Sequence, residues 1–246
     1  MTPAVRVQSL RHVYPDGHRA LDGVDLTVET GERVAVLGPN GAGKTSLMLH
    51  LNGVLTASSG TVEINGITIA RRNLRAIRQL VGVVFQDPDD QLFMPTVAQD
   101  VAFGPANFGV GGADLAERVT AALAAVSLAD QAERSPAHLS AGQRRRAALA
   151  TVLACRPDVL VLDEPSANLD PLGRRELAET LMTLQTTLLI VTHDLPYAAQ
   201  LCDRAIVMDA GAVVADGAIG SVLADAELLA RHRLELPWGF RVDKPD

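Results

Sequence analysis

The feature that most constrains this chain is a glycine-rich segment, Gly38–Thr45, with the sequence GPNGAGKT. It has the spacing GxxxxGK[ST] and stands between a run typical of a buried strand, ERVAVL, and a run typical of a helix, KTSLMLHL. Glycines let backbone N–H groups converge on phosphate oxygens, and the helix start adds the positive end of its dipole. The segment therefore predicts a phosphate-binding turn, in preference to a glycine-rich turn without a ligand.

Individual roles follow from the chemistry of this turn. Lys44 is expected to reach the β- and γ-phosphates of a nucleotide, and the Thr45 hydroxyl is expected to bind Mg²⁺. The expected nucleotide-binding residues of the turn are Asn40, Gly41, Ala42, Gly43, Lys44, Thr45 and Ser46. Taken alone, the motif indicates nucleotide binding and no particular activity.

The strand and helix signals around the turn predict an α/β fold. Two short β-like runs before it, VRVQSL and VDLTV, indicate an antiparallel sheet. Apolar runs at 159–163, 186–192 and 204–209, separated by helical stretches, indicate a mostly parallel sheet. Between 95 and 154 strand signals vanish and apolar residues recur at helical spacing, namely Leu115, Val119, Ala122, Leu123 and Val126. We expect one domain with a core of 1–94 and 155–220, an inserted helical part of 95–154, and a short helical tail of 221–246.

Composition narrows the class of protein. The net charge of -7 argues against a nucleic-acid partner, because phosphate-backbone binders need clustered excess Lys and Arg. The two cysteines, Cys155 and Cys202, lie in apolar helical settings without metal-ligand spacing, so buried reduced thiols are expected. No run has the length of a signal peptide's apolar region or of a membrane span, which predicts a cytoplasmic protein or one on the cytoplasmic face of a membrane complex.

An acidic pair follows the strand VLVLD. The strand brings Asp163 and Glu164 to its carboxyl end, where open α/β sheets bind their ligands. Asp163 suits the Mg²⁺ shell, and Glu164 is placed to act as a general base or to orient the attacking water. The alternative is a solvated acidic turn, which the preceding phosphate turn makes less favourable.

A third segment points to one family. Leu139-Ser140-Ala141-Gly142-Gln143 opens a helical run shortly before VLVLDEP, and this combination resembles the signature segment of ABC ATPases. The structural alternative for Ser140 is a helix N-cap, and the run Arg144–Arg146 is expected to be a solvated helical face. The helix start also offers backbone donors for a γ-phosphate.

Other segments match the ABC order over nearly the whole chain. Tyr14 matches the aromatic residue that stacks on adenine, with a core-rim aromatic as the alternative. Gln86 matches the Q-loop glutamine, which implies a place in both the catalytic set and the Mg²⁺ shell. The segment 167–170 matches the D-loop, with Asp170 in the nucleotide site. His193 matches the switch histidine, a catalytic and nucleotide-binding role, with a satisfied strand-end histidine as the alternative.

The resemblance implies a RecA-like phosphate-loop core, an N-terminal antiparallel β subdomain and an inserted ABC α-helical subdomain. It also implies a head-to-tail dimer, in which Ser140 and Gly142 reach the γ-phosphate of the ATP held by the partner's Lys44. Ala141 and Gln143 of the same segment are also expected to bind the nucleotide. Catalysis then rests on Glu164, His193, Lys44 and Gln86, with ATP and Mg²⁺ as cofactors. Two residues depart from the family pattern: Ala141 replaces a glycine, and Asn168 stands where small residues are common.

Within the family, the segment VFQDPDDQLF at 84–93 resembles the ATPases of energy-coupling-factor (ECF) transporters, as do YPDG at 14–17 and DVAFGP at 100–105. The tail RLELP at 233–237 is similar to the cobalt and nickel uptake branch. The resemblance implies a transmembrane coupling subunit, docked near the acidic run Asp87–Asp90, and a substrate-binding membrane subunit. The alternative for the acidic run is a solvated loop.

The sequence is compatible with several transport functions. Cobalt is the expected substrate, with nickel or a vitamin such as biotin as alternatives. Another ABC importer is a near rival, although such ATPases often append a regulatory domain. A soluble ABC ATPase is less favoured, because those proteins usually carry two ABC domains or a long coiled coil. A non-enzymatic binding module is disfavoured because Glu164 and His193 are both present.

Overall fold

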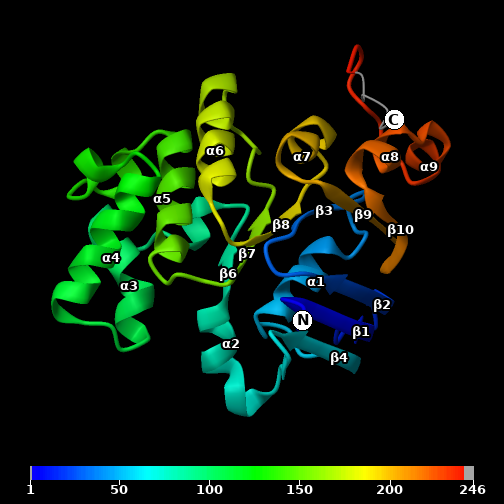
Figure 1. The fold of residues 1–246 in the computed structure, drawn as a ribbon, viewed down its shortest axis with the longest axis horizontal. Helices are drawn as coiled ribbons and strands as arrows, with labels where there is room; N and C mark the ends of the chain where they lie inside the picture. Colours follow the sequence, from blue (N-terminus) through cyan, green and yellow to red (C-terminus); the bar gives the residue numbers. More distant parts are fainter. Residues whose placement is uncertain (1, 241–246) are drawn as a thin grey trace.

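In the computed structural model, residues 2–240 are described, and the strands among them form two sheets (Figure 1). The first sheet has the order β2-β1-β4-β5 and is antiparallel throughout. Its strands are β1 Val5–Val13, β2 Arg19–Val28, β4 Ser59–Ile64 and β5 Ile67–Thr68. The second sheet has the order β10-β9-β3-β8-β7-β6. Its strands are β3 Arg33–Leu37, β6 Val81–Val84, β7 Val159–Asp163, β8 Thr187–Val191, β9 Arg204–Asp209 and β10 Ala212–Ala218.

The second sheet is parallel from β6 to β9, and β10 is added antiparallel to β9. The predicted α/β class with a mostly parallel sheet is therefore confirmed. Strands β7 and β9 coincide with the apolar runs at 159–163 and 204–209. These strands read as continuous apolar runs because both of their faces are covered.

Alternating residues of the second sheet enter two different buried clusters. On β3, Val34 and Val36 face the cluster that contains α1 and the antiparallel sheet, whereas Ala35 and Leu37 face the cluster that contains α3 to α7. The side-chain period of two in a strand explains this division. The second sheet therefore separates the two buried clusters.

The helices surround these sheets. They are α1 Lys44–Leu51, α2 Leu74–Leu80, α3 Val97–Asn107, α4 Gly112–Ala125, α5 Ala141–Leu153, α6 Pro171–Thr183, α7 Leu195–Leu201, α8 Ile219–Ala224 and α9 Ala226–Arg231. Short 3₁₀ turns occur at η1 Arg71–Asn73, η2 Pro88–Asp90, η3 Ala129–Gln131 and η4 Pro136–His138. Within residues 2–240, no helix is long and apolar enough to cross a bilayer.

Helices α3, α4 and α5 pack on one another at one side of the second sheet, drawn in green in Figure 1. On α4 and just beyond its end, the predicted apolar face is buried at Ala122, Leu123 and Val126, and is partly buried at Leu115 and Val119. Helix α9 lies within the predicted tail, whereas α8 begins at Ile219, before the predicted boundary at 221. Residues 241–246 of the tail are outside the described part of the chain.

Candidate active site

The glycine-rich segment connects the end of β3 to the start of α1, as the sequence predicts. Gly38, Gly41 and Gly43 all have positive φ, at 149°, 81° and 97°. Space also demands glycine at Gly43, because a Cβ there would stand 2.4 Å from the carbonyl oxygen of Ala20. The backbone of this turn is therefore set both by conformation and by its close packing on the antiparallel sheet.

The Lys44 side chain is held over the turn. Its Nζ donates hydrogen bonds to the carbonyl oxygens of Gly38 at 2.7 Å and Pro39 at 3.0 Å. Burial lowers the pKa of Lys44, and the nearby carboxylates of Glu164 and Asp163 act in the opposite direction. The arrangement places a buried cation where the turn would bind phosphate.

Oxygen ligands meet beside Lys44. The Thr45 hydroxyl donates to Asp163 Oδ2 at 3.2 Å, and Gln86 lines the same pocket. Burial raises the pKa of Asp163, whereas the hydrogen bond from Thr45 lowers it. A hydroxyl, a carboxylate and an amide oxygen are the hard ligands that Mg²⁺ prefers, so the residues present fit this ion. When bound, the ion would offset the charge of the β- and γ-phosphates.

Glu164 occupies a strained backbone position with φ of 44°, directly after β7. Its carboxylate is buried and accepts hydrogen bonds from the Thr192 hydroxyl at 2.9 Å and the His193 backbone N–H at 3.1 Å. His193 Nδ1 lies 2.7 Å from Glu164 Oε1, while most of the ring is exposed. A strained backbone conformation at a residue whose side chain is held by several hydrogen-bond donors is typical of functional sites.

A pocket of about 300 Å³ gathers most of the predicted site. Of the predicted residues it is lined by Tyr14, Asn40, Gly41, Ala42, Gly43, Lys44, Thr45, Ser46, Gln86, Asp163, Glu164 and His193. Tyr14 stands at its rim with its hydroxyl 3.1 Å from Ser46 Oγ. His18, which the sequence analysis missed, also lines the pocket, and its ring is nearly parallel to that of Tyr14.

Thr192 is a second residue that the sequence analysis missed. It is fully buried after β8, and its hydroxyl both donates to Glu164 and accepts from the Asp194 N–H at 3.0 Å. Its position directly before His193 was the available signal.

The signature segment is separate from this pocket. Of the residues described, Ser140, Gly142, Gln143 and Asp170 do not line it. Ser140 Oγ instead accepts from the Gln143 N–H, and Gln143 Oε1 accepts from the Ser140 N–H, which is a reciprocal capping box at the start of α5. The N-cap alternative for Ser140 thus holds within one chain. Asp170 likewise caps α6 by accepting from the Gly173 N–H at 2.7 Å.

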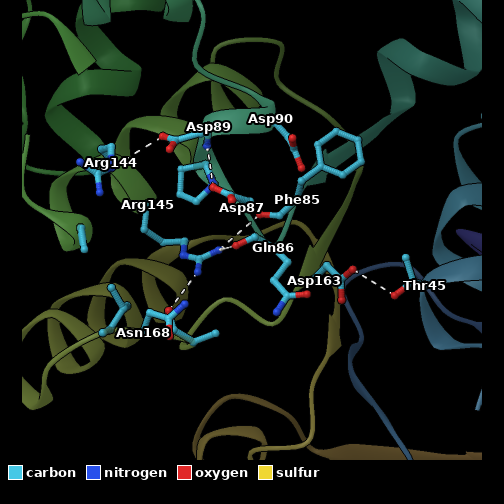
Figure 2. A pocket seen from close by; sticks show the side chains of 14 residues that line it. Thr45, Phe85, Gln86, Asp87, Asp89, Asp90, Arg144, Arg145, Asp163 and Asn168 are labelled. Carbon is cyan, nitrogen blue, oxygen red and sulfur yellow. Dashed lines mark hydrogen bonds and ion pairs between the residues drawn. The ribbon is translucent and has the colours of Figure 1, made fainter. Parts of the chain in front are cut away.

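A neighbouring cleft of about 640 Å³ lies between the residues after β6, the start of α5 and the loop before α6 (Figure 2). It is lined by Thr45, Phe85, Gln86, Asp87, Pro88, Asp89, Asp90, Ala141, Arg144, Arg145, Asp163, Ala167, Asn168 and Leu169. Ala141 is therefore the one signature residue that shares a cavity with Thr45 and Gln86 among the described residues. Asn168, the other departure from the family pattern, has a positive φ of 61°.

The expected solvated face at Arg144–Arg146 is wrong for Arg145. Arg145 is 3% exposed, and its guanidinium points toward Gln86 in Figure 2. Arg144 is partly exposed and lies 3.8 Å from Asp89, and Arg146 pairs with Glu176 at 3.3 Å. Consecutive helical residues point in directions roughly 100° apart, so one of three neighbouring arginines can face the core while the others do not.

The fold and the pocket define a nucleotide hydrolase of the phosphate-loop class, and comparison with known proteins identifies its family. The family model described as "ABC transporter" matches residues 21–167, and the chain belongs to this family of ABC ATPases, which couple ATP hydrolysis to transport. A Streptomyces avermitilis protein named as an ABC transporter ATP-binding protein is 60% identical, over 97% of this chain and 91% of its own length.

Further relatives narrow the type. The energy-coupling factor transporter ATP-binding protein EcfA of Carboxydothermus hydrogenoformans is 48% identical, over 96% of this chain and 88% of its own. CbiO1 of Clostridium perfringens, described as part of the transporter complex CbiONQ, superposes with a TM-score of 0.84 at 37% identity, covering 96% and 97% of the two chains. The chain is thus an ABC ATPase of the ECF type.

A dimeric relative has also been solved. The ATP-binding cassette MJ0796, in a post-hydrolysis state with ADP and Pi, superposes with a TM-score of 0.78 at 27% identity. The superposition covers 87% of this chain and 98% of that one.

Proposed function

We propose that two copies of this chain associate head to tail and hydrolyse ATP at two shared sites. Each site combines Lys44, Asp163, Glu164 and His193 of one copy with Ser140, Gly142 and Gln143 of the other. The observation that carries this proposal is the separation of the signature segment from the nucleotide pocket of its own chain. The dimeric state of MJ0796 supports it.

The proposed chemistry assigns each group a task. Lys44 and the turn hold the phosphates, and Thr45, Asp163 and Gln86 hold Mg²⁺. Glu164 accepts a proton from the attacking water or orients it, and Thr192 and His193 hold its carboxylate in place. Tyr14 and His18, whose nearly parallel rings line the pocket, are assigned to the binding of the base.

The energies of contacts to the γ-phosphates are sufficient to switch the dimer between an open and a closed state. Converting a dimer from mostly open to mostly closed takes about 5.5 kcal/mol of differential binding. Hydrogen bonds to charged groups contribute roughly 1.5–3 kcal/mol each, so a few contacts to two γ-phosphates reach this value, and hydrolysis removes them.

Mixing two inactive variants tests the shared site. Lys44→Ala removes the ammonium group that would bind phosphate in a chain's own pocket. Ser140→Arg places a bulky, charged side chain in the pocket of the partner. Each variant alone is expected to be inactive, whereas a mixed dimer has one intact site. Equal mixing should restore ATPase activity up to about one quarter of the wild-type value, because half of the dimers are mixed and each has one intact site of two. Coupling between the two sites lowers the value below this limit.

The controls for this experiment concern the cap of α5. Ser140→Ala loses the same N-cap, worth about 1 kcal/mol, without the bulk and charge of arginine, so its thermal unfolding separates lost stability from a blocked site. Differently tagged chains report whether the mixed dimer forms. A shared site is contradicted if the mixed dimer forms in Mg-ATP and the mixture stays inactive.

We also propose that the dimer sits on the cytoplasmic face of the membrane, bound to a transmembrane coupling subunit and a substrate-binding membrane subunit. The surface next to the large cleft supports this. Asp89 and Asp90 are exposed on η2, and beyond them Phe93 and Phe103 form an exposed edge-to-face pair with centroids 4.9 Å apart. Exposed aromatic residues beside charges are typical of protein interfaces.

We assign the helices α3 to α5, residues 95–154, to an inserted subdomain on a core of 1–94 and 155–220, with a tail of 221–246.

Two substitutions test this surface by co-purification from solubilised membranes. Asp90→Lys and Phe93→Ser are expected to lose the membrane subunits while keeping the ATP-dependent dimer, because both side chains are exposed. Glu179→Lys, an equal charge reversal on the exposed side of α6, is the matched control and should retain them. Retention by both test variants would contradict the assigned surface.

For the substrate we propose cobalt ions, supported by the tail segment at 233–237 and by the likeness to CbiO1 of a CbiONQ complex. The wild-type complex that co-purifies from solubilised membranes can be reconstituted in vesicles and supplied with Mg-ATP. The vesicles should then accumulate Co²⁺ in preference to Ni²⁺ or biotin. Uptake of either competitor in its place would assign the chain to that transporter. Recovery without any integral membrane protein would favour a soluble ABC ATPase.

A further inference from the structure

Arg145 joins three segments of the site through one buried side chain. Its Nη1 donates to the backbone carbonyl oxygens of Phe85, at 3.3 Å, and Gln86, and its Nη2 donates to that of Ala167 at 3.0 Å. Figure 2 shows the guanidinium between the chain at Gln86 and the loop that carries Asn168. Arg145 itself belongs to α5.

All three segments line the cleft beside the nucleotide pocket, but in the proposed dimer they belong to different nucleotide sites. Gln86 lines the nucleotide pocket of its own chain. The signature segment at the start of α5 and the loop 167–170 lie outside that pocket, and in the proposed dimer they complete the site of the partner. Ser140 precedes Arg145 by five residues, roughly 7 Å along a rigid helix, so a displacement at the guanidinium is transmitted to the signature segment.

We propose that Arg145 is a positioning residue that couples the nucleotide pocket of one chain to the segments with which that chain completes its partner's pocket. This inference rests on the proposed head-to-tail dimer. Nucleotide at Gln86 shifts the carbonyl that Arg145 binds, and the start of α5 and the loop 167–170 move with it.

Arginine is suited to this task in a way that lysine is not. The planar guanidinium presents donors in a fixed fork and can bind the two loops at once, whereas an ammonium is a point charge without a fixed direction. Burial lowers the pKa of Arg145, and the carboxylates of Asp87 and Asp163 act in the opposite direction. An arginine side chain keeps its charge in proteins. The contacts also pair three backbone carbonyls that, among the described residues, have no partner within a helix or strand.

The test uses Arg145→Lys and Arg145→Met, each alone and combined with Glu164→Gln. ADP affinity reports the pocket of a single chain, because ADP lacks the γ-phosphate that joins the two chains. We expect ADP affinity to change by less than about fivefold, the lower end of typical coupling. ATP turnover should fall at least roughly tenfold, and the Hill coefficient for ATP should fall from near 2, the number of sites, toward about 1. Formation of the Mg-ATP dimer by the Glu164→Gln chain should need roughly tenfold more protein once Arg145 is replaced.

Arg175→Met is the matched control, since Arg175 is exposed and pairs only with Glu179 at 3.8 Å among the described residues. It should leave all of these quantities unchanged. Thermal unfolding checks that the Arg145 variants are folded, and Arg145→Lys keeps the charge if Arg145→Met is unstable.

The outcomes separate the two proposals. If Glu164→Gln alone stays monomeric in Mg-ATP, the dimer itself is wrong and the coupling fails with it. If Glu164→Gln dimerises and the added Arg145→Lys changes neither dimerisation nor the Hill coefficient, the dimer stands and the coupling role is overturned. A large loss of ADP affinity would also overturn it, because Arg145 would then act within its own pocket.

Discussion

Replacing Glu164 with glutamine is expected to abolish nearly all ATP turnover and to leave a dimer that Mg-ATP stabilises. Glutamine keeps the shape of the side chain and can still accept one hydrogen bond from Thr192 or His193, but it cannot take a proton. General-base catalysis contributes about 10²–10⁴-fold, so phosphate release should fall by at least about 100-fold. The bound γ-phosphates then continue to hold the two chains together.

Phosphate release and gel filtration in Mg-ATP measure the two parts of this prediction. Glu179→Gln, an equal change at an exposed site on α6, should behave as the wild type. A Glu164→Gln chain that elutes as a monomer in Mg-ATP would sink the shared-site proposal. Full turnover would remove Glu164 from the catalytic set.

Gly43→Ala is expected to destroy the phosphate-binding turn and with it nucleotide binding. The added Cβ would stand 2.4 Å from the Ala20 carbonyl oxygen and 3.0 Å from Leu21 Cδ2, so the loop or the antiparallel sheet must move. The φ of 97° adds strain for any residue with a Cβ. Overpacking costs about 1–3 kcal/mol and left-handed backbone about 1–2 kcal/mol, which together approach the stability of a marginal fold.

Gly41→Ala is the matched control in the same turn. Gly41 has a φ of 81°, yet a Cβ there meets nothing within 4 Å. Only the backbone strain remains, so the free energy of unfolding should fall by about 1–2 kcal/mol, much less than for Gly43→Ala. Urea unfolding and ADP titration compare the two. Equal losses in both variants would show that conformation alone, and not the contact with Ala20, requires glycine at Gly43.

Local patterns in the chain were sufficient for much of the fold. The apolar runs at 159–163 and 204–209 coincide with β7 and β9, because strands buried on both faces need apolar residues at every position. The helical spacing before Val126 identified the buried face of α4, because a helix that packs on the core by one face needs apolar residues every three or four positions. These elements depend on residues a few positions apart, which a single sequence displays.

Local patterns likewise predicted some residues of the candidate site and missed others. The phosphate turn and the acidic pair follow strand ends, and parallel strands end at one edge of the sheet, so Lys44, Asp163 and Glu164 could be expected together. Thr192 and His18 were missed because a threonine after a strand and a histidine in a turn have many ordinary roles. Only the approach of β8 to β7 places Thr192 against Glu164.

By itself, the sequence determined the phosphate turn and the α/β order of the chain, and it supplied the candidate residues for binding and hydrolysing a nucleotide. These follow from short-range spacing and from the chemistry of each side chain. The tertiary structure alone decided that Arg145, within an arginine run, is buried. It also places Ser140 and Gln143, which the family resemblance assigns to the partner's site, outside the pocket of their own chain. The acceptors of Arg145 at Gln86 and Ala167 are 59 and 22 residues away. Which of three neighbouring arginines meets them depends on how α5 packs against β6 and the loop after β7, and no local pattern encodes that packing.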